Sequence, residues 1–338
     1  MNQILTKVSI IIPVYNVEQY LKQCLDSVIN QTFKDIEIIV INDCSPDNSL
    51  QIIKDYQQKD NRIVLIDLKQ NVGIGLVRNE GLKIAKGKYV TFIDSDDWIA
   101  NNYVEVLYNT IEKYQYDVIS PNFYSYDETT KKLSLGKQPQ CFYNINISNV
   151  KLKQKFLYFE KTHYLRKIFK LDFLRKNNIV FHINKLEDTL FVWEVLINTN
   201  KFMFIKDKLY YYRTSINNSF IDKNTKCKIE LQNTINLATE IKKVLVKNFD
   251  TYKNFKPVLN SFIMNRLFPL SGKYPNEFKK SYPDFKKDFF ENEKIEFYHI
   301  NTVESFAKIF LFKLLFKFNI NIMFLSKAYN KLKIMRKK

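Results

Sequence analysis

Short apolar runs alternate along the first hundred residues with longer segments in which apolar residues recur at helical spacing. The apolar runs are rich in β-branched residues, which favour buried strands. They predict strands over residues 8–14, 36–41, 62–66 and 88–93. Between these runs, apolar residues recur three and four positions apart, as in an amphipathic helix. Strands alternating with helices predict an α/β fold with a Rossmann-like, doubly wound and mostly parallel sheet.

Polar side chains directly follow three of these strands. They are Tyr15 and Asn16 after the first strand, Asp43 after the second, and Asp94 and Asp96 after the fourth. In doubly wound sheets, ligands bind beyond the carboxyl ends of the strands, where neighbouring strand ends converge. The shared placement therefore predicts one binding site at this edge, although each residue taken alone could serve in a turn or a helix cap.

The fourth strand ends in the acidic segment Asp94-Ser95-Asp96-Asp97. Carboxylates crowded at the end of a buried strand repel one another and lose hydration, so a positive charge must offset the cost. Mg²⁺ or Mn²⁺ suits a pair of carboxylates that leaves coordination positions open for substrate phosphates. The alternative is that these acids cap a helix beginning at Trp98, since Asp is favoured in the first turn of a helix.

Two further segments predict how helices begin near this edge. Ser45, Pro46 and Asp47 provide an N-cap, a proline at the first helical position and an acid in the first turn. The glycine-containing turn at residues 71–79 opens the next helix and carries Arg78 where a dinucleotide-binding fingerprint has its third glycine. This difference disfavours a nucleotide-dependent oxidoreductase. Arg78 is expected to balance the carboxylates or hold a phosphate, unless it forms an ordinary surface ion pair.

The net charge of +18 is concentrated in the second part of the chain. Residues 1–120 carry 16 acidic and 12 basic side chains, whereas residues 121–338 carry 19 acidic and 41 basic ones. Such an excess suits nucleic acid, anionic lipid or an acidic substrate. Because Lys greatly outnumbers Arg, the residue that most often reads bases and grips phosphates, no nucleic-acid partner is expected.

The last stretch of the sequence combines apolar and basic residues. Residues 305–318 are apolar with Lys at roughly helical spacing, and residues 301–338 carry nine basic side chains and one acidic one. This combination predicts a helix that lies on an anionic membrane surface, the alternative being a terminal helix packed on the core. No signal segment and no run of ~18 apolar residues is found, so we expect a cytoplasmic protein, peripheral on the inner face of the plasma membrane. The cysteines have no paired spacing, which argues against zinc and disulfides and suits a reducing cytosol: Cys24, Cys44, Cys141 and Cys227.

Taken in order, several motifs resemble glycosyltransferase family 2, whose members have the GT-A fold. The motifs are residues 8–16, 41–47, 71–79 and 94–97. The resemblance covers residues 8 to about 120 closely and resumes over residues 167–213. The sequence departs from the usual pattern at Val77, where the family has Ala, and at Leu186, where it more often has Gly. The resemblance implies an inverting transfer of a sugar from a nucleotide-diphosphate donor with Mn²⁺ or Mg²⁺.

The resemblance also implies roles for residues at matching positions. The donor contacts are expected to be Pro13, Tyr15, Asn16, Glu18, Asp43, Asn71, Arg78, Asp94, Ser95 and Arg213. Among them, Asp43 matches the acid that receives the uracil N–H, and Arg213 belongs to a segment that closes over the diphosphate. Asp96 matches the metal ligand of the Asp-x-Asp pair. No histidine stands where many relatives place a further metal ligand, so water or diphosphate oxygens are expected to complete the coordination.

An inverting transfer needs a carboxylate on the acceptor side that takes the proton of the acceptor hydroxyl. Glu187-Asp188 matches the Glu-Asp pair that opens a helix in the family. The resemblance therefore implies that Asp188 is the general base and that Glu187 orients the acceptor. The alternative from the residues alone is a helix N-cap, because Asp188 precedes the segment at residues 189–193.

These inferences divide the chain into three parts. Residues 1–120 are expected to bind the nucleotide sugar, residues 121–220 to form the acceptor half of the GT-A domain, and residues 221–338 to form a helical, basic region. The predicted enzyme transfers a sugar, with a UDP-sugar the expected donor, to a glycan or lipid-linked acceptor in cell-surface polysaccharide or lipooligosaccharide synthesis. The alternative is a basic membrane- or nucleic-acid-binding protein on a catalytically inactive GT-A scaffold.

Overall fold

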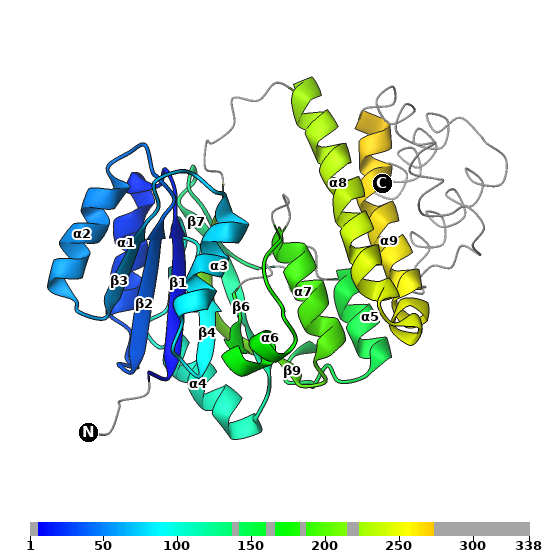
Figure 1. Cartoon of the computed structure of the whole chain (residues 1–338), viewed down its shortest axis with the longest axis horizontal. Helices are drawn as coiled ribbons and strands as arrows, with labels where there is room; N and C mark the ends of the chain where they lie inside the picture. Colours follow the sequence, from blue (N-terminus) through cyan, green and yellow to red (C-terminus); the bar gives the residue numbers. More distant parts are fainter. Residues whose placement is uncertain (1–5, 137–141, 160–165, 183–186, 215–222, 274–338) are drawn as a thin grey trace. The chain divides into compact units, whose positions relative to one another are not determined.

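The chain divides into two compact units, residues 1–183 with 187–218 and residues 184–186 with 219–338. The computed structural model describes residues 6–136, 142–159, 166–182, 187–214 and 223–273. In the described residues, the first unit contains a β-sheet with helices on both faces, and the second unit is helical (Figure 1). The separate functions expected for residues 1–120, 121–220 and 221–338 stay predictions.

The predicted N-terminal strands form the parallel half of the sheet. They are β1 (Val8–Val14), β2 (Ile36–Asn42), β3 (Ile63–Asp67) and β4 (Tyr89–Phe92). Their order is β3-β2-β1-β4, and each neighbouring pair is parallel. Because helices cover both faces, β1 is buried along its whole length rather than at alternate residues. The carboxyl ends of these strands lie side by side at one edge.

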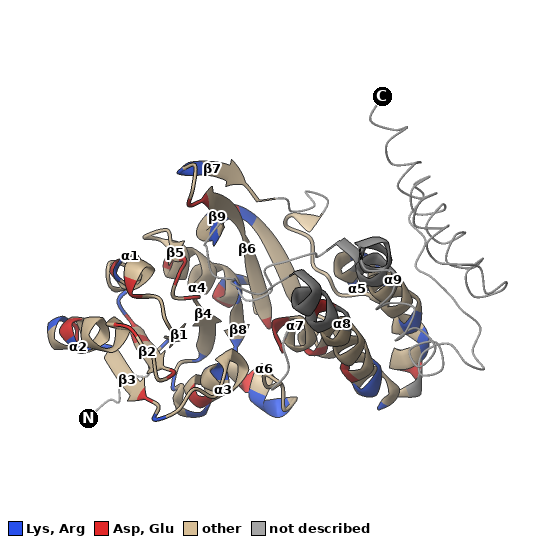
Figure 2. Ribbon diagram, turned by 90° about the horizontal axis from the view of Figure 1, so that it is seen from above, with Lys and Arg blue, Asp and Glu red and all other residues tan. Residues whose placement is uncertain are grey.

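Helices cover both faces of this parallel half. Figure 2 shows α1 (Glu18–Ile29), α2 (Ser49–Lys59) and α4 (Tyr103–Tyr114) on one face and α3 (Ile74–Ile84) on the other. Ile10 and Ile12 of β1 belong to the core cluster shared with α1, α2 and α4. Ile11 faces α3, because its Cγ2 would lie 2.6 Å from a Cβ added at Gly81. The core therefore occupies both faces of the sheet, which confirms the predicted doubly wound arrangement.

The second helix begins later than the sequence predicts. The expected start at residues 45–47 is wrong, since α2 begins at Ser49. Oδ2 of Asp47 accepts the backbone N–H of Glu18 at 2.8 Å, and Oδ1 accepts that of Ser49 at 3.1 Å. Glu18 in turn accepts the backbone N–H of Asn48 at 2.8 Å. The carboxylate of Asp47, just before α2, thereby satisfies a backbone donor at the start of α1. The carboxylate of Glu18, in α1, satisfies one at the start of α2. This exchange fixes the two helix starts against each other.

Beyond β4 the sheet becomes mixed. Its further strands are β5 (Trp98–Ile99), β6 (Val118–Asp127), β7 (Lys132–Leu135), β8 (Ile168–Lys170) and β9 (Phe202–Thr214). β8 is antiparallel to β4 and β6, and β9 is parallel to β6. β5 pairs antiparallel with β9, and β7 pairs antiparallel with β6. Since Trp98 begins a strand, the acidic segment before it does not cap a helix there, and that alternative is excluded.

Further helices complete the described part of the first unit. They are α5 (Val150–Phe159), α6 (Leu171–Lys176) and α7 (Glu187–Asn198). In α7, Phe191 stacks on Phe181 with 4.1 Å between the ring centroids. The same ring meets Phe92 of β4 at 6.0 Å and Phe169 of β8 at 5.4 Å, both edge-on. This aromatic cluster packs α7 against the sheet and so fixes the start of the helix.

In the second unit, the described helices are α8 (Lys223–Val246) and α9 (Phe249–Lys273). Ile241 and Leu245 of α8 and Val258 and Ile263 of α9 are fully buried. None of the helices in the described part of the chain is long and apolar enough to cross a membrane. The segment at residues 305–338, predicted to lie on a membrane surface, is outside the described residues.

Candidate functional site

A cavity of ≈ 410 Å³ opens at the carboxyl ends of the parallel strands. This volume lies within the ~300–1,000 Å³ that small-ligand sites usually have. Its lining comprises Pro13, Val14, Tyr15, Val17, Asp43, Asn71, Gly73, Ile74, Val77, Asp94, Ser95 and Asp96. Pro13 and Val14 end β1, and the other residues follow β1, β2, β3 or β4 along the chain, so the strand ends converge on one cavity.

Most of the predicted donor and metal residues lie in this lining, namely Pro13, Tyr15, Asp43, Asn71, Asp94, Ser95 and Asp96. Asn16, Glu18, Arg78 and Arg213 lie outside the lining that the described residues form. Asn16 adopts a positive φ of 54° and donates its backbone N–H to the hydroxyl of Ser45 at 3.4 Å. Glu18 accepts the backbone N–H of Asn48, the residue before α2, as described above. The binding roles of all these residues stay predictions.

Asp43 is held by the loop that precedes α3. Its Oδ1 accepts the backbone N–H of Val72 at 2.8 Å, and its Oδ2 accepts the backbone N–H of Gly73 at 3.0 Å. The side chain of Asn71 donates to the carbonyl oxygen of Asp43 at 3.3 Å. Asp43 is only 3% exposed, so these donors fix a carboxylate whose other lone pairs can accept a hydrogen bond from a ligand.

Glycines shape the start of α3. Gly73, the residue before the helix, has a φ of +87°, which residues with a side chain rarely adopt. A Cβ at Gly75 would lie 2.6 Å from the carbonyl oxygen of His182 and 3.2 Å from Cγ of Glu187. Because Gly75 has no side chain, His182 and Glu187 can lie close to the first turn of α3. The close approach brings Glu187 within reach of Arg78.

Arg78 connects the end of β4 to the start of α7. Its Nη2 donates to Oδ1 of Asp94 at 2.8 Å, and its Nη1 donates to Oε1 of Glu187 at 2.7 Å. The guanidinium lies 5.4 Å from the ring centroid of Phe181. The Arg78 side chain is 3% exposed, which excludes the alternative of an ordinary surface ion pair. It is a buried bridge, and removing one partner of such a pair leaves an uncompensated charge.

The residues Asp94–Asp97, here called the acidic turn, carry three carboxylates. Burial and the neighbouring carboxylate of Asp94 raise the pKa of Asp96 to about 6. A carboxylate whose ionised form is disfavoured in this way is stabilised by a cation, and its hard oxygens suit Mg²⁺ or Mn²⁺. Because Asp94 and Asp96 line the cavity with carboxylate oxygens, the acidic turn fits a divalent cation. Within the described residues, no group of three Asp, Glu, His or Cys side chains is placed to hold such an ion alone.

Asp97 differs from the other two acids of the turn. It is 1% exposed, its Oδ2 accepts the hydroxyl of Tyr210 at 2.7 Å, and its Oδ1 accepts the backbone N–H of Arg213 at 2.7 Å. Burial raises the pKa of Asp97 well above its ordinary value, and the carboxylates of Asp96 and Asp94 add to this. Asp97 thus ties the turn to β9. The sequence analysis missed this role because adjacent acids carry no signal that separates an anchor from a ligand.

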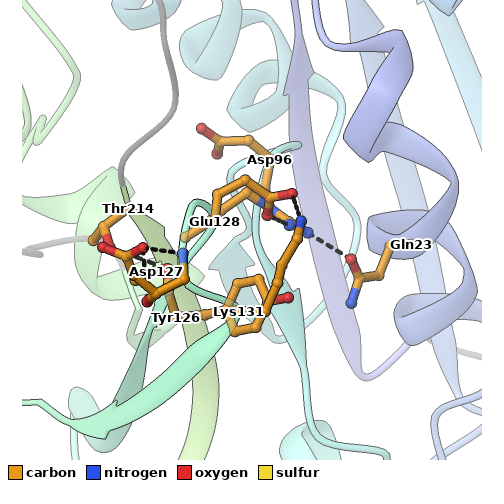
Figure 3. A network of polar contacts seen from close by, with 9 residues as sticks. Gln23, Asp96, Tyr126, Asp127, Glu128, Lys131 and Thr214 are labelled. Atoms are coloured by element: carbon orange, nitrogen blue, oxygen red, sulfur yellow. Dashed lines mark hydrogen bonds and ion pairs between the residues drawn. The ribbon is translucent and has the colours of Figure 1, made fainter.

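Arg213 holds the acidic turn from the same strand. Its Nε donates to the carbonyl oxygen of Asp96 at 2.7 Å, and its Nη1 and Nη2 donate to Glu128 and Gln23. Figure 3 shows the carboxylate of Asp96 turned away from Gln23. Arg213 is 6% exposed and lies outside the cavity lining that the described residues form. Glu128 and Gln23 are also residues that the sequence analysis missed, since neither belongs to a recognisable motif.

The predicted catalytic acids begin α7. The side chain of Glu187 is 11% exposed, and burial raises its pKa while the guanidinium of Arg78 opposes the rise. Oδ1 of Asp188 accepts the backbone N–H of Thr189 at 2.7 Å. Because α7 begins at Glu187, Asp188 lies in its first turn, where the helix dipole favours an ionised carboxylate. Asp188 directly follows Glu187, and the side chain of Glu187 is linked through Arg78 to the acidic turn.

Comparison with known proteins identifies similar sequences. The model of the family described as glycosyl transferase family 2 matches residues 9–173. Glycosyltransferase GlyA of Streptococcus pneumoniae serotype 4 is 38% identical over 214 residues, which are 61% of this chain and 30% of GlyA. Glycosyltransferase GlyG of the same organism is 31% identical over 211 residues, which are 61% of this chain and 70% of GlyG. The matched region thus spans most of GlyG and less than a third of GlyA.

The TarS protein of Staphylococcus aureus, a poly(ribitol-phosphate) beta-N-acetylglucosaminyltransferase, is 31% identical over 212 residues, which are 62% of this chain and 35% of TarS. The crystal structure of TarS residues 1–349 in complex with UDP-GlcNAc matches this structure with a TM-score of 0.71. The match covers 96% of this chain and 92% of that chain at 24% sequence identity. At that identity the likeness concerns the fold, and it confirms the predicted GT-A fold.

Proposed function

The chain belongs to glycosyltransferase family 2, and we propose that it transfers a sugar, with inversion, from a UDP-sugar to a glycan or lipid-linked acceptor. The product would extend a cell-surface polysaccharide or lipooligosaccharide. One observation carries the proposal: Asp43, Asp94 and Asp96 meet in one cavity, and Arg78 links the same acidic turn to Glu187. A basic binding protein on an inactive scaffold would have no use for this convergence of carboxylates.

For the donor, we assign the uridine to the part of the cavity around Asp43. The carboxylate of Asp43 is fixed by backbone donors and can accept the uracil N–H. Tyr15 lines the cavity and is 49% exposed, so its ring is available to a flat base. Pro13 and Asn71 complete this part of the lining. TarS is crystallised with UDP-GlcNAc, which supports a uridine nucleotide for this chain.

For the diphosphate, we assign Asp96 as the protein ligand of Mn²⁺ or Mg²⁺ and Asp94 as its neighbour toward the ribose. When bound, the cation supplies positive charge that stabilises the departing diphosphate. The chain contributes the carboxylate of Asp96. Burial and the neighbouring Asp94 raise its pKa, so a cation would stabilise its ionised form. Arg78 neutralises part of Asp94 through a bond at 2.8 Å, so the two acids can lie side by side in the cavity lining.

For the acceptor, we assign Asp188 as the general base that takes the hydroxyl proton. Such a base contributes on the order of 10²–10⁴ in rate. Glu187, the preceding residue, is proposed to orient the acceptor, and its carboxylate is held by Arg78. One guanidinium thereby positions both the turn that receives the donor and the helix that carries the base.

The enzyme is proposed to work at a membrane surface. Residues 305–338 combine apolar and basic side chains, which suits anionic lipid and would hold the enzyme near a lipid-linked acceptor. Co-sedimentation with anionic vesicles, strong at low salt and absent with neutral lipid, is the expected result. Binding that does not depend on anionic lipid would contradict this part of the proposal.

The proposed function is tested by hydrolysis of nucleotide sugars without an acceptor. The purified full chain is incubated with a panel of UDP-sugars and GDP-sugars in MnCl₂ or in EDTA. Slow release of UDP from one UDP-sugar, abolished by EDTA, supports the proposal. No release and no binding of any nucleotide would favour the inactive scaffold, whereas release from GDP-sugars alone would overturn the uridine assignment.

A further inference from the structure

Arg213 makes contacts with the acidic turn that donor binding does not explain. Its backbone N–H donates to Oδ1 of Asp97 at 2.7 Å, and its Nε donates to the carbonyl oxygen of Asp96 at 2.7 Å. One residue of β9 therefore holds two consecutive residues of the turn, through its main chain and through its side chain. Both contacts fix the backbone from which the Asp96 carboxylate projects.

The rest of the guanidinium is held from other elements. Nη1 donates to Glu128, which directly follows β6 and also pairs with Lys131, and Nη2 donates to Gln23 of α1 (Figure 3). Arg213 is 6% exposed, and charge-assisted hydrogen bonds are strong where water is excluded. The guanidinium could turn toward a diphosphate only by giving up these bonds.

Aromatic rings surround the same guanidinium. Its Cζ lies 4.7 Å from the ring centroid of Tyr20 and 4.9 Å from that of Trp98. Trp98 stacks on Tyr211 at 5.1 Å with an interplanar angle of 5°, and Tyr211 stacks on Tyr124 at 5.5 Å. These contacts cross β5, β9 and β6, so they connect Arg213 to the sheet itself.

We infer that Arg213 is a positioning residue, which sets the place of the Asp96 carboxylate for the divalent cation and does not contact the diphosphate. The inference rests on the proposed function, in which Asp96 is the metal ligand. Arg213 acts on the main chain of Asp96, while the side chain of Asp96 lines the cavity and points away from Gln23 (Figure 3). In a preorganised site, a displacement of about 1 Å can cost on the order of 10²-fold.

The test measures the affinity of the full chain for UDP by calorimetry, once in EDTA and once in MnCl₂. The ratio of the two dissociation constants gives the manganese effect. Arg213→Lys keeps the positive charge but loses the planar fork that donates in several directions. We expect the manganese effect to fall by about tenfold or more, and the affinity in EDTA to stay at the wild-type value. Glu128→Ala, which removes one partner of Arg213, should lower the manganese effect less and in the same direction.

Arg62→Lys is the matched control. Arg62 also donates to a backbone carbonyl, that of Ile29 at 2.8 Å, and to the carboxylate of Asp60 at 2.6 Å. It lies outside the acidic turn and the cavity lining, so its replacement should lower the melting temperature without changing the manganese effect. Melting curves show that each titrated variant is folded, and Glu128→Ala decides the question where Arg213→Lys does not fold.

The outcomes separate the inference from the function on which it rests. An unchanged manganese effect in the folded Arg213→Lys or Glu128→Ala variant overturns the inference and leaves the proposed function intact. A loss of UDP affinity that is equal in EDTA and MnCl₂ also overturns it, because a lost diphosphate contact produces that result. A wild-type chain whose UDP affinity does not depend on manganese overturns the proposed metal site and the inference together.

Discussion

The acidic turn is held in opposite ways on its two sides. On the cavity side, Asp94 and Asp96 line the site, and burial together with Asp94 raises the pKa of Asp96 to about 6. On the β9 side, both carboxylate oxygens of Asp97 accept hydrogen bonds, from Tyr210 and from the backbone of Arg213, at 2.7 Å each. The protein thus satisfies the carboxylate oxygens of Asp97 with hydrogen bonds, whereas Asp94 and Asp96 face the cavity.

Adjacent carboxylates of one motif can therefore have separate roles. A site for a cation needs charge that the protein only partly neutralises, whereas a buried anchor needs every polar atom satisfied. The two arginines show the same contrast. Arg78 contacts the carboxylate side chain of Asp94 in the turn, whereas Arg213, which also pairs with Glu128, contacts the turn at the main-chain carbonyl of Asp96. Replacing residues on each side should therefore change different measured properties.

The largest effect is expected at Asp188 in α7, the helix that Arg78 links to the cavity side of the acidic turn. Asp188→Asn should lower turnover by on the order of 10²–10⁴, because the amide keeps the shape of the carboxylate and loses its basicity. UDP affinity should stay close to the wild-type value, as measured by calorimetry on the same preparation. Asp172→Asn is the matched control, since Asp172 is an exposed acid in the first turn of α6. A collapse of UDP affinity in Asp188→Asn would place this residue in the donor site or in the fold.

The next effect concerns the buried bridge. Arg78→Met should lower the free energy of unfolding by about 3–5 kcal/mol, because it leaves the carboxylates of Asp94 and Glu187 without their partner. Burial raises the pKa of Glu187 and Arg78 opposes the rise, so the pKa of Glu187 should rise further in the variant. When the pKa of a carboxyl group is higher in the folded state than in the unfolded state, protonating that group stabilises the folded protein relative to the unfolded chain. The deficit relative to wild type should therefore shrink as the pH falls through the acid range.

Chemical denaturation at neutral and acid pH measures this change. Arg62→Met serves as the control, because Arg62 pairs with Asp60 at a more exposed position, with 21% of its side chain accessible. A deficit in Arg78→Met that does not vary with pH would contradict the bridge as the source of the loss.

The smallest effect is expected on the β9 side. Tyr210→Phe removes the hydroxyl that donates to Asp97 and should lower the free energy of unfolding by about 1–3 kcal/mol, the usual cost of leaving a buried acceptor unsatisfied. UDP affinity in EDTA should not change. Tyr211→Phe, one residue along the same strand, keeps the ring stacking and should be nearly neutral. Equal losses in the two variants would show that the hydroxyl of Tyr210 has no special role as a partner of Asp97.

Hydrophobic patterning was sufficient to predict the parallel half of the sheet. β1 and β2 are buried by helices on both faces, so each apolar run in the sequence is interrupted only near its start, by one polar residue, Ser9 or Glu37. The rule that ligands bind beyond the strand ends then placed Asp43 and Asp96 in one site, and both line the same cavity. The parallel half of the sheet and the cavity at its strand ends thus follow from local sequence and from the geometry common to doubly wound sheets.

Other features depend on contacts that the sequence does not record. Glu187 and Arg78 are 109 positions apart, and their bond requires the close approach that Gly75 allows. Trp98 begins a strand because β9 lies beside it, although Asp residues before it suggest a helix cap. α2 begins at Ser49, after Asp47 has accepted backbone N–H groups at the starts of both α1 and α2. In each case a tertiary contact overrides the local preference.

We propose that the cavity side of the acidic turn binds UDP together with a divalent cation. Calorimetry of UDP binding to the full chain, with and without MnCl₂, tests it most directly when wild type is compared with Asp96→Ala. Asp67→Ala is the matched control, because Asp67 ends β3 and lies outside the cavity lining formed by the described residues. We predict that manganese tightens UDP binding in wild type and in Asp67→Ala and has no effect in Asp96→Ala. An Asp96→Ala chain that keeps the full manganese effect would contradict the account.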